Sequence, residues 1–182
     1  MRFFYFYIKS IVFPIREMNF DQVIKDKIFR SFEEFSFLLN KWQKKNFKLV
    51  FTNGCFDILH RGHADSLIKS ASFGDKLIVG LNSDSSVKIL KGSDRPVFDQ
   101  ESRAYLLASL QMVDAVVIFE EETPYELIGK IQPDVLVKGS EYKLEEIAGY
   151  DIVLAKGGTV ERIELTPGFS TSETIRRINS KI

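Results

Sequence analysis

Short apolar runs alternate with segments of helical periodicity along most of the chain. Apolar runs bounded by turn residues predict strands at residues 49–52, 76–81, 115–119, 134–137, 152–155 and 160–165. Apolar residues at helical spacing predict helices at residues 62–72, 84–90, 100–110, 124–131 and 170–178. The early runs are apolar at nearly every position, which is typical of parallel strands covered on both faces.

Strands that alternate with helices predict βαβ units, in which parallel strands lie in one sheet. Because the crossovers in such units are right-handed, we expect an α/β fold with a Rossmann-like, doubly wound parallel sheet. No internal repeat, low-complexity tract or long linker interrupts residues 47–182, so we predict one domain there. The length of 182 residues allows one such domain and leaves no room for two full enzymes.

Residues 1–46 are predicted to form an N-terminal extension with one helix. Between residues 19 and 45 the pattern is helical, and Ser31 and Glu34 have the spacing of a capping box. The apolar start of the chain is interrupted by a lysine and a proline, and its uncharged stretch is far shorter than the ~20 residues that span a bilayer. No small-residue cleavage site follows. We therefore expect a leader without a membrane role and leave open whether translation starts at Met18.

Charge and composition narrow the class of protein. The 25 Lys and Arg residues balance 25 Asp and Glu residues, which argues against a general nucleic-acid binder but allows a local cationic pocket. A single cysteine, Cys55, excludes a disulfide framework, and two histidines exclude a His-rich metal site. These two histidines are only three positions apart, which indicates functional chemistry in the segment around them.

The loop after the first strand of the predicted domain carries that chemistry. Its residues are Thr52, Asn53, Gly54, Cys55 and Phe56, followed closely by His60, Gly62 and His63. Ligands bind beyond the carboxyl ends of the strands in a doubly wound sheet. We expect Gly54 to allow a tight turn and Gly62 to leave space where a helix begins, so that free amides of the helix bind a phosphate.

His60 and His63 are expected on one face of the first turn of that helix, because they are spaced i and i+3. Two imidazoles beside a phosphate can donate hydrogen bonds to the charge that builds during phosphoryl transfer, and we favour this catalytic role. The alternative is a pair of histidines that cap the helix or pack in the core. Cys55 is expected to be a small, inert turn residue rather than a nucleophile.

The segment HRGH at residues 60–63, after the run TNGCFD, resembles the HxGH signature of the cytidylyltransferase-like nucleotidyltransferases. Further segments resemble one branch, the bacterial adenylyltransferases of ADP-heptose synthesis; they lie at residues 74–84, 90–92, 95–96, 113–114, 122–124 and 133–139. The resemblance implies transfer of AMP from ATP, with Mg²⁺, to the sugar 1-phosphate D-glycero-β-D-manno-heptose 1-phosphate. The products would be pyrophosphate and ADP-heptose, a precursor of the lipopolysaccharide core.

The same resemblance implies a setting for the enzyme. Members of this branch occur fused to a sugar kinase or free-standing, and we expect the free-standing form, with a separate heptose kinase upstream in the pathway. The resemblance also implies a cytoplasmic homodimer that neither binds nucleic acid nor spans a membrane.

The resemblance implies further site residues. They are Lys91, chosen over Lys88 as the catalytic lysine that neutralises phosphate; Arg103, facing a substrate phosphate; Lys138 and Gly139 at the nucleotide; and Ser170, Thr171 and Ser172, which hold phosphates where the last helix begins. Ser170 and Glu173 also fit a capping box. Ser140 and Glu141 depart from the VKGGDY pattern of the branch, and a serine disfavours positive φ. Leu165 stands where glycerol-3-phosphate cytidylyltransferases carry an arginine, which argues against that alternative activity.

The expected mechanism needs no general base, because the acceptor is already a phosphate dianion. Mg²⁺ is expected to be bound chiefly by ATP and water, since the sequence presents no carboxylate cage for a metal. Two pH dependences stay open: the rate follows the acceptor dianion, or it depends on a protonated histidine. A different phosphorylated acceptor and a non-catalytic nucleotide-binding module are the alternative hypotheses.

Overall fold

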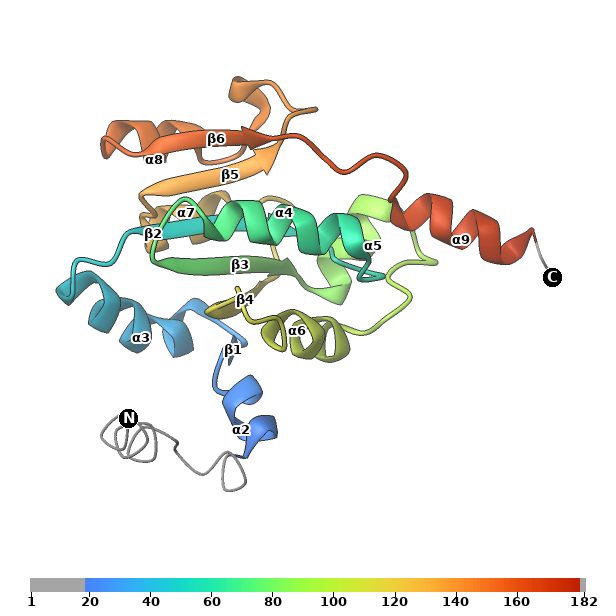
Figure 1. The fold of residues 1–182 in the computed structure, drawn as a ribbon, viewed down its shortest axis with the longest axis horizontal. Coiled ribbons are helices and arrows are strands. Elements are labelled where there is room, and N and C mark those ends of the chain that lie inside the picture. The colour runs from blue at the N-terminus through green and yellow to red at the C-terminus, as the bar shows by residue number, and fades with distance from the viewer. Residues whose placement is uncertain (1–18, 181–182) are drawn as a thin grey trace, which may run out of the picture.

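The structure, a computed structural model, describes residues 19–180 (Figure 1). In this part of the chain six parallel strands form one sheet in the order β1-β4-β3-β2-β5-β6. The strands are β1 (Ile28–Phe29), β2 (Leu49–Gly54), β3 (Lys76–Asn82), β4 (Ala115–Phe119), β5 (Val135–Gly139) and β6 (Thr159–Ile163). The predicted doubly wound, Rossmann-like α/β fold is confirmed.

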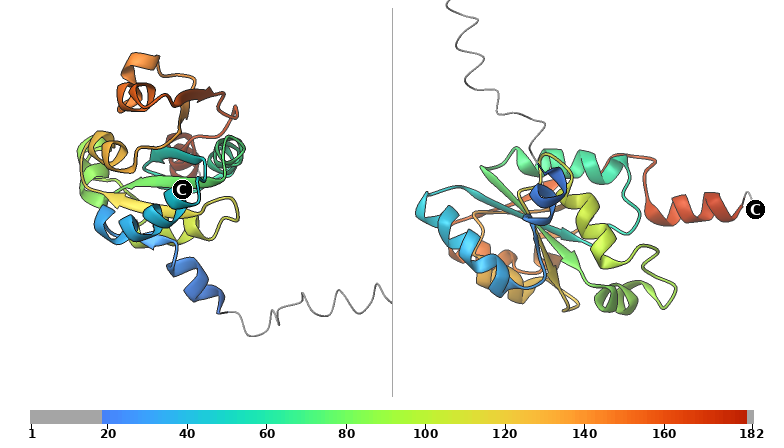
Figure 2. Two further views of the ribbon diagram at one scale, coloured as in Figure 1. Left: turned by 90° about the vertical axis from the view of Figure 1, so that its left-hand side faces the viewer. Right: turned by 90° about the horizontal axis from the view of Figure 1, so that it is seen from below.

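Helices cover both faces of this sheet (Figure 2). They are α2 (Phe20–Lys25), α3 (Phe32–Lys44), α4 (Arg61–Ala71), α5 (Asp84–Lys91), α6 (Gln100–Ala108), α7 (Tyr125–Ile131), α8 (Tyr150–Ala155) and α9 (Thr171–Asn179), with a short 3₁₀ turn η2 (Leu144–Glu146). Apolar side chains of α3, α7 and α8 pack on one face, and those of α4 and α6 pack on the other. In both figures α9 projects away from this body.

Side chains of the central strands alternate between the two layers of the core. On β2, Leu49 and Phe51 join the cluster under α3 and α7, whereas Val50 joins the cluster under α4 and α6. Successive side chains of a strand point to opposite faces, so a strand covered on both faces must be apolar at every position. This explains why the periodicity of the central strands is so easily recognised in the sequence.

The strand order places a switch point between β2 and β5. From β2 the chain runs outward through β3 to β4, and it then returns to add β5 on the other side of β2. Connections that leave in opposite directions open a crevice beyond the carboxyl ends of the two strands. The segments that follow β2 and β5 are therefore brought together at this edge of the sheet.

The prediction of a strand at residues 152–155 is wrong, because these residues belong to the helix α8. Tyr150 and Val153, spaced i and i+3, face the core, whereas Leu154 is 46% exposed. Gly149 and Gly157, at φ 83° and 85°, bracket the helix in the left-handed conformation that glycine adopts easily. A short run of β-branched and aliphatic residues satisfies both patterns, and only the packing separates them.

The prediction of one helix in the N-terminal segment is wrong. The structure has two helices there, α2 and α3, and between them lies β1, an edge strand that the sequence analysis did not predict. Half of the predicted capping box is present: Ser31 Oγ accepts from the backbone N–H of Glu34 at 3.3 Å, whereas the Glu34 carboxylate accepts the backbone N–H of Arg30 and not that of Ser31. Phe35 and Trp42 of α3 belong to the buried core that covers the sheet. The boundary predicted between residues 46 and 47 stays a prediction, but residues 28–44 share the core of the domain.

Among residues 19–180, none of the helices is both long and apolar enough to cross a membrane. The leader predicted at residues 1–15 and the alternative start at Met18 lie outside the described residues.

Candidate active site

A cleft of about 600 Å³ opens beyond the carboxyl ends of β2, β3 and β5. Its volume is typical of a site for a small molecule. Twelve predicted site residues line it: Thr52, Asn53, Gly54, Cys55, Phe56, His63, Lys91, Lys138, Gly139, Ser170, Thr171 and Ser172. The other three predicted residues, His60, Gly62 and Arg103, are not part of this lining.

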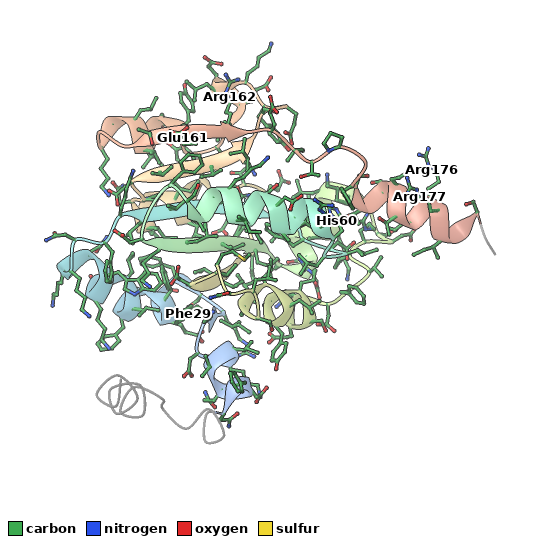
Figure 3. All side chains as sticks on the ribbon, viewed as in Figure 1. Phe29, His60, Glu161, Arg162, Arg176 and Arg177 are labelled. Atoms are coloured by element: carbon green, nitrogen blue, oxygen red, sulfur yellow. The ribbon has the colours of Figure 1, made fainter. Side chains whose placement is uncertain are left out.

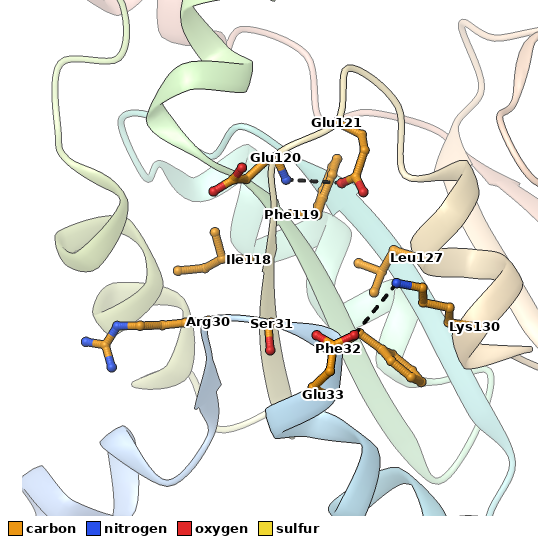
Figure 4. Close-up of a pocket in the computed structure, with 10 residues that line it drawn as sticks. All are labelled: Arg30, Ser31, Phe32, Glu33, Ile118, Phe119, Glu120, Glu121, Leu127 and Lys130. Atoms are coloured by element: carbon orange, nitrogen blue, oxygen red, sulfur yellow. Dashed lines mark hydrogen bonds and ion pairs between the residues drawn. The ribbon is translucent and has the colours of Figure 1, made fainter.

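A smaller hollow of about 250 Å³ lies where α3 begins, beside the end of β4 (Figure 4). Its lining combines Arg30 and Lys130 with Glu33, Glu120 and Glu121. Lys130 Nζ lies 3.9 Å from Oε1 of Glu33, so opposite charges within the hollow offset one another. None of the predicted site residues lines it, and the larger cleft is therefore the candidate site.

The turn after β2 is shaped by Phe56 rather than by Gly54. Phe56 has a φ of 45°, a left-handed conformation that bulky residues rarely adopt. Gly54 does not have positive φ, but a Cβ there would lie 3.1 Å from Cε2 of Phe56. The prediction that Gly54 permits a tight turn is therefore wrong: this glycine leaves room for an aromatic ring.

His60 caps α4. Its Nδ1 accepts the backbone N–H of His63 at 3.3 Å, the role that a serine or aspartate side chain usually fills. Gly62 leaves space as predicted, since a Cβ there would lie 2.9 Å from Cβ of Phe169 and 3.2 Å from the His60 ring. The capping alternative therefore describes His60, whose ring also stacks on His63 with centroids 3.8 Å apart.

His63 is the histidine that lines the cleft. Burial, together with the charge of His60, lowers the pKa of His63 to about 4, so its imidazole is neutral at pH 7. Nδ1 of His63 and Oδ1 of Asn53 are buried and lack a hydrogen-bond partner among the described residues. Buried polar atoms are usually hydrogen-bonded. These two atoms therefore mark positions where a ligand or water would complete the site.

The start of α9 forms the opposite wall of the cleft. Ser170 Oγ accepts the backbone N–H of Glu173 at 3.1 Å. The Glu173 carboxylate, however, pairs with Arg176 and Arg177, so only half of the predicted capping box forms. Figure 3 shows His60 beside this helix start and both arginines along α9.

Two side chains attach the segment before α9 to α4. Thr166 Oγ1 donates to Oδ2 of Asp65 at 2.8 Å. The Phe169 ring lies 6.2 Å from the His60 ring and 5.9 Å from the guanidinium carbon of Arg61. The two helix starts therefore face one ligand space, although they are far apart in the sequence.

Lysines at the ends of α5 and β5 add positive charge. Lys91 lines the cleft and Lys88 does not, as expected from the choice between them. Lys138 Nζ donates to the backbone oxygen of Asn53 at 3.3 Å, and burial lowers the pKa of Lys138 to about 8.

Burial also raises the pKa of the Cys55 thiol, so Cys55 stays protonated near neutral pH, as expected of an inert turn residue.

The departures from the branch pattern after β5 do not strain the backbone. Ser140 is not among the described residues with positive φ, so a glycine is not required there. Glu141 lines the cleft and folds back over Gly139, where an added Cβ would collide with its carboxylate. The longer acidic side chain thus lies against the floor of the cleft.

Arg103 does not have the environment of a substrate-binding residue. Its side chain is 0% exposed, and its guanidinium donates to the backbone oxygens of Phe98, Cys55 and Asn82 and to Oδ1 of Asp84. Four of the five guanidinium N–H groups are thus engaged within the protein. Arg103 ties the loops that border the cleft together, which contradicts the predicted phosphate-facing position.

Asp57 and Arg95 also line the cleft; both lie in segments that resemble the family, but the sequence predicted no site role for them. Asp57 accepts from Nε of Arg95 and from the backbone N–H groups of Val97 and Phe98. An acidic residue just after a buried strand was an available signal in the sequence. Its partners lie 38 to 41 positions further along the chain, so their identity depended on the fold.

Comparison with known proteins places the chain in a family. The model of the family described as "Cytidylyltransferase-like" matches residues 51–177. The chain is similar to proteins named "Bifunctional protein HldE": 50% identical over 84% of the chain to that of Nitrobacter winogradskyi, 51% over 91% to that of Nitratiruptor sp., and 53% over 82% to that of Aliarcobacter butzleri. It spans about a third of their length, at 31%, 34% and 30% respectively.

A solved structure agrees with this assignment. The crystal structure titled as the lipopolysaccharide core biosynthesis protein from Thermoplasma volcanium matches with a TM-score of 0.54 and 30% sequence identity, over 66% of this chain and 97% of that one. Family, fold and cleft agree with the predicted activity class. The chain belongs to the cytidylyltransferase-like family and is a nucleotidyltransferase.

Proposed function

We propose that this chain transfers AMP from ATP to D-glycero-β-D-manno-heptose 1-phosphate, which gives ADP-heptose and pyrophosphate. The observation that carries the proposal is one cleft lined by His63, the Ser170 helix start, Lys91 and Lys138. Two substrates that both bear phosphates need amides and cations on more than one wall of a site. The similarity to HldE proteins and to a lipopolysaccharide core biosynthesis protein supports a sugar phosphate as the acceptor.

The chemistry follows from the charge of the acceptor. An oxygen of the sugar phosphate attacks the α-phosphorus of ATP, a new P–O bond forms, and the bond to the pyrophosphate leaving group breaks. The attacking oxygen is already anionic, so positioning and charge neutralisation are the work of the protein. His63, being neutral, donates a hydrogen bond without a change in its own charge. Lys91 and Lys138 neutralise the substrate phosphates.

Mg²⁺ enters this proposal as part of the ATP substrate. The described residues contain no group of three or more His, Cys, Asp or Glu side chains that would hold a metal ion. The proposal therefore assigns the ligands of Mg²⁺ to phosphate oxygens of ATP and to water, the hard oxygen ligands that this ion prefers. Titrating Mg²⁺ against ATP tests this: the rate should follow the MgATP concentration.

A matrix of pyrophosphate-release assays tests the proposed function. ATP and CTP are each combined with heptose 1-phosphate and with glycerol 3-phosphate, and reactions without an acceptor serve as controls. We expect the highest kcat/KM for ATP with heptose 1-phosphate. Faster turnover of CTP with glycerol 3-phosphate would show that the acceptor assignment is wrong.

The quaternary and pathway assignments stay predictions. A homodimer and a separate heptose kinase upstream are implied by the family resemblance alone, and the free-standing form, which the resemblance does not decide, also stays a prediction. Light scattering on the purified chain measures its oligomeric state, and the homodimer predicts twice the monomer mass of 20.9 kDa.

A further inference from the structure

Arg95 lies in the cleft with only one edge of its guanidinium occupied. Nε donates to Oδ2 of Asp57, and it is the only guanidinium nitrogen of Arg95 for which the described residues supply an acceptor. The Arg95 side chain is 17% exposed and that of Asp57 is 1% exposed. The terminal nitrogens Nη1 and Nη2 are therefore held in a largely buried place, beside the ligand space, without protein partners.

The position of this guanidinium is fixed from behind. Besides Arg95, Asp57 accepts the backbone N–H groups of Val97 at 2.7 Å and Phe98 at 3.1 Å. These bonds close the loop after α5 onto the turn after β2. An arginine held in this way has already lost much of the rotamer freedom that binding would otherwise remove.

Arg103 provides the internal comparison. It is the same residue type at the same end of the sheet, but four of its N–H groups already have protein acceptors and it does not line the cleft. Arg95 lines the cleft and keeps the pair of nitrogens that matches two oxygens of a phosphate. Within residues 19–180, Arg95, and not Arg103, therefore has free guanidinium nitrogens beside the cleft where a substrate phosphate would bind.

Other positive charges gather at the same place. Lys91 and Lys138 line the cleft with Arg95. Their charges, together with that of the buried Arg103, oppose the rise in the pKa of the Cys55 thiol that burial causes. Three cations along the wall of one cleft favour an anion of high charge there.

We infer that Arg95 is a phosphate-binding residue of this site, whose Nη1 and Nη2 donate a bidentate pair of hydrogen bonds to a substrate phosphate, and that Asp57 is its positioning residue. The phosphate belongs to either the nucleotide or the acceptor. The inference deepens the proposed function and rests on it only for the identity of the acceptor.

The test compares Arg95→Ala and Arg95→Lys with the wild type, and Arg30→Ala is the matched control. Arg30 also pairs with a carboxylate, Glu101, but this exposed pair is not part of the cleft. Calorimetry with inorganic pyrophosphate, inorganic phosphate and MgATP is combined with KM values for both substrates. Loss of a charged hydrogen-bonding group predicts binding weakened by about 10–100-fold in Arg95→Ala. Partial recovery is expected in Arg95→Lys, and no change in the control.

The arms of the experiment assign the phosphate. Weaker binding of pyrophosphate and MgATP would place Arg95 at the nucleotide phosphates. Weaker binding of inorganic phosphate, with a raised KM for the acceptor, would place Arg95 at the acceptor phosphate. Asp57→Asn, which keeps an oxygen for the loop amides, should weaken the same ligand by a smaller factor. A lower melting temperature of Arg95→Ala with all affinities and KM values unchanged would overturn the inference. Because pyrophosphate and phosphate need no sugar, failure of the heptose assignment leaves this test intact.

Discussion

The two helix starts that meet at the cleft are built in opposite ways. α4 begins inside the body of the protein, where Gly62 is buried and His60 and His63 stack on each other. α9 begins at the surface, where Ser170 is exposed, and it then runs away from the body (Figure 1). Contacts of Phe169 and Thr166 join the second start to the first.

This difference indicates that the two helix starts contribute to different steps of the reaction. Donors fixed in place before the reaction stabilise a transition state because they need no reorganisation. A segment held by few contacts has low local stability, and its hydrogen bonds to a ligand depend on how it docks. We therefore expect changes at α4 to act mainly on kcat and changes at the start of α9 to act mainly on substrate affinity.

The largest effect is expected for His63→Ala. Loss of one preorganised donor typically lowers kcat by about 10²–10³-fold, and the affinity for ATP should change much less. His60→Ala removes a cap that contributes about 1 kcal/mol of stability, so it should lower the melting temperature more and kcat less. Steady-state kinetics and thermal unfolding of both variants separate these roles. A destabilised His63→Ala enzyme with near-normal turnover at a permissive temperature would reject the catalytic role.

Gly62→Ala should break the junction between the two starts. The new Cβ would lie 2.9 Å from Cβ of Phe169, and overpacking of this kind typically destabilises by about 1–3 kcal/mol. Since the segment before α9 is the more easily displaced partner, we expect KM for ATP to rise by about 10-fold, with a smaller change in kcat. Phe169→Gly in the same chain removes the opposing Cβ and should relieve part of the defect. Additive effects of the two substitutions would contradict the proposed contact.

A smaller effect is expected for Ser170→Ala. The variant loses the acceptor for the backbone N–H of Glu173, which typically weakens a helix start by about 1 kcal/mol. This corresponds to an increase in KM for ATP of about five-fold, with kcat preserved. Ser170→Thr keeps the hydroxyl and serves as the control. Equal kinetics of the Ala and Thr variants would exclude a role for this hydroxyl in binding.

Burial of His63 at the start of α4 also predicts a dependence of stability on pH. The pKa of His63 is about 4 in the folded protein, below the ordinary value of 6.5 for a histidine. The unfolded chain therefore binds the proton first as the pH falls. The contribution of His63 to stability is complete above pH 6.5 and is lost between pH 6.5 and pH 4. In urea unfolding, the wild type should lose more stability over this window than His63→Asn. Parallel pH profiles of the two proteins would refute the burial of a neutral imidazole.

Local sequence patterns predicted most of this molecule, for a physical reason. Strands covered on both faces must be apolar throughout, so β2 and β4 could be predicted from a few consecutive residues. A helix start is stabilised by a side-chain acceptor for the N–H three residues later, so the cap at Ser31 could be predicted in the same way. The loop after β2 and the Ser170 segment were likewise predicted to bind phosphates, because helix starts with free amides favour them, and both segments line the cleft. All of these features depend on neighbours in the chain.

Only the tertiary structure decided the features that depend on distant partners. The segment 152–155 lies in a helix beside β5 and β6, with Tyr150 and Val153 of that helix in the core, although its composition suits a strand equally well. His60 and His63 have the same side chain, yet one caps a helix and the other faces the ligand space. Arg103 is held inside the protein because acceptors from the loops around Cys55, Asn82 and Asp84 surround its guanidinium, whereas Asp57 holds only one edge of Arg95. A sequence states which groups a chain carries, but burial and the choice of partner are set where distant segments meet.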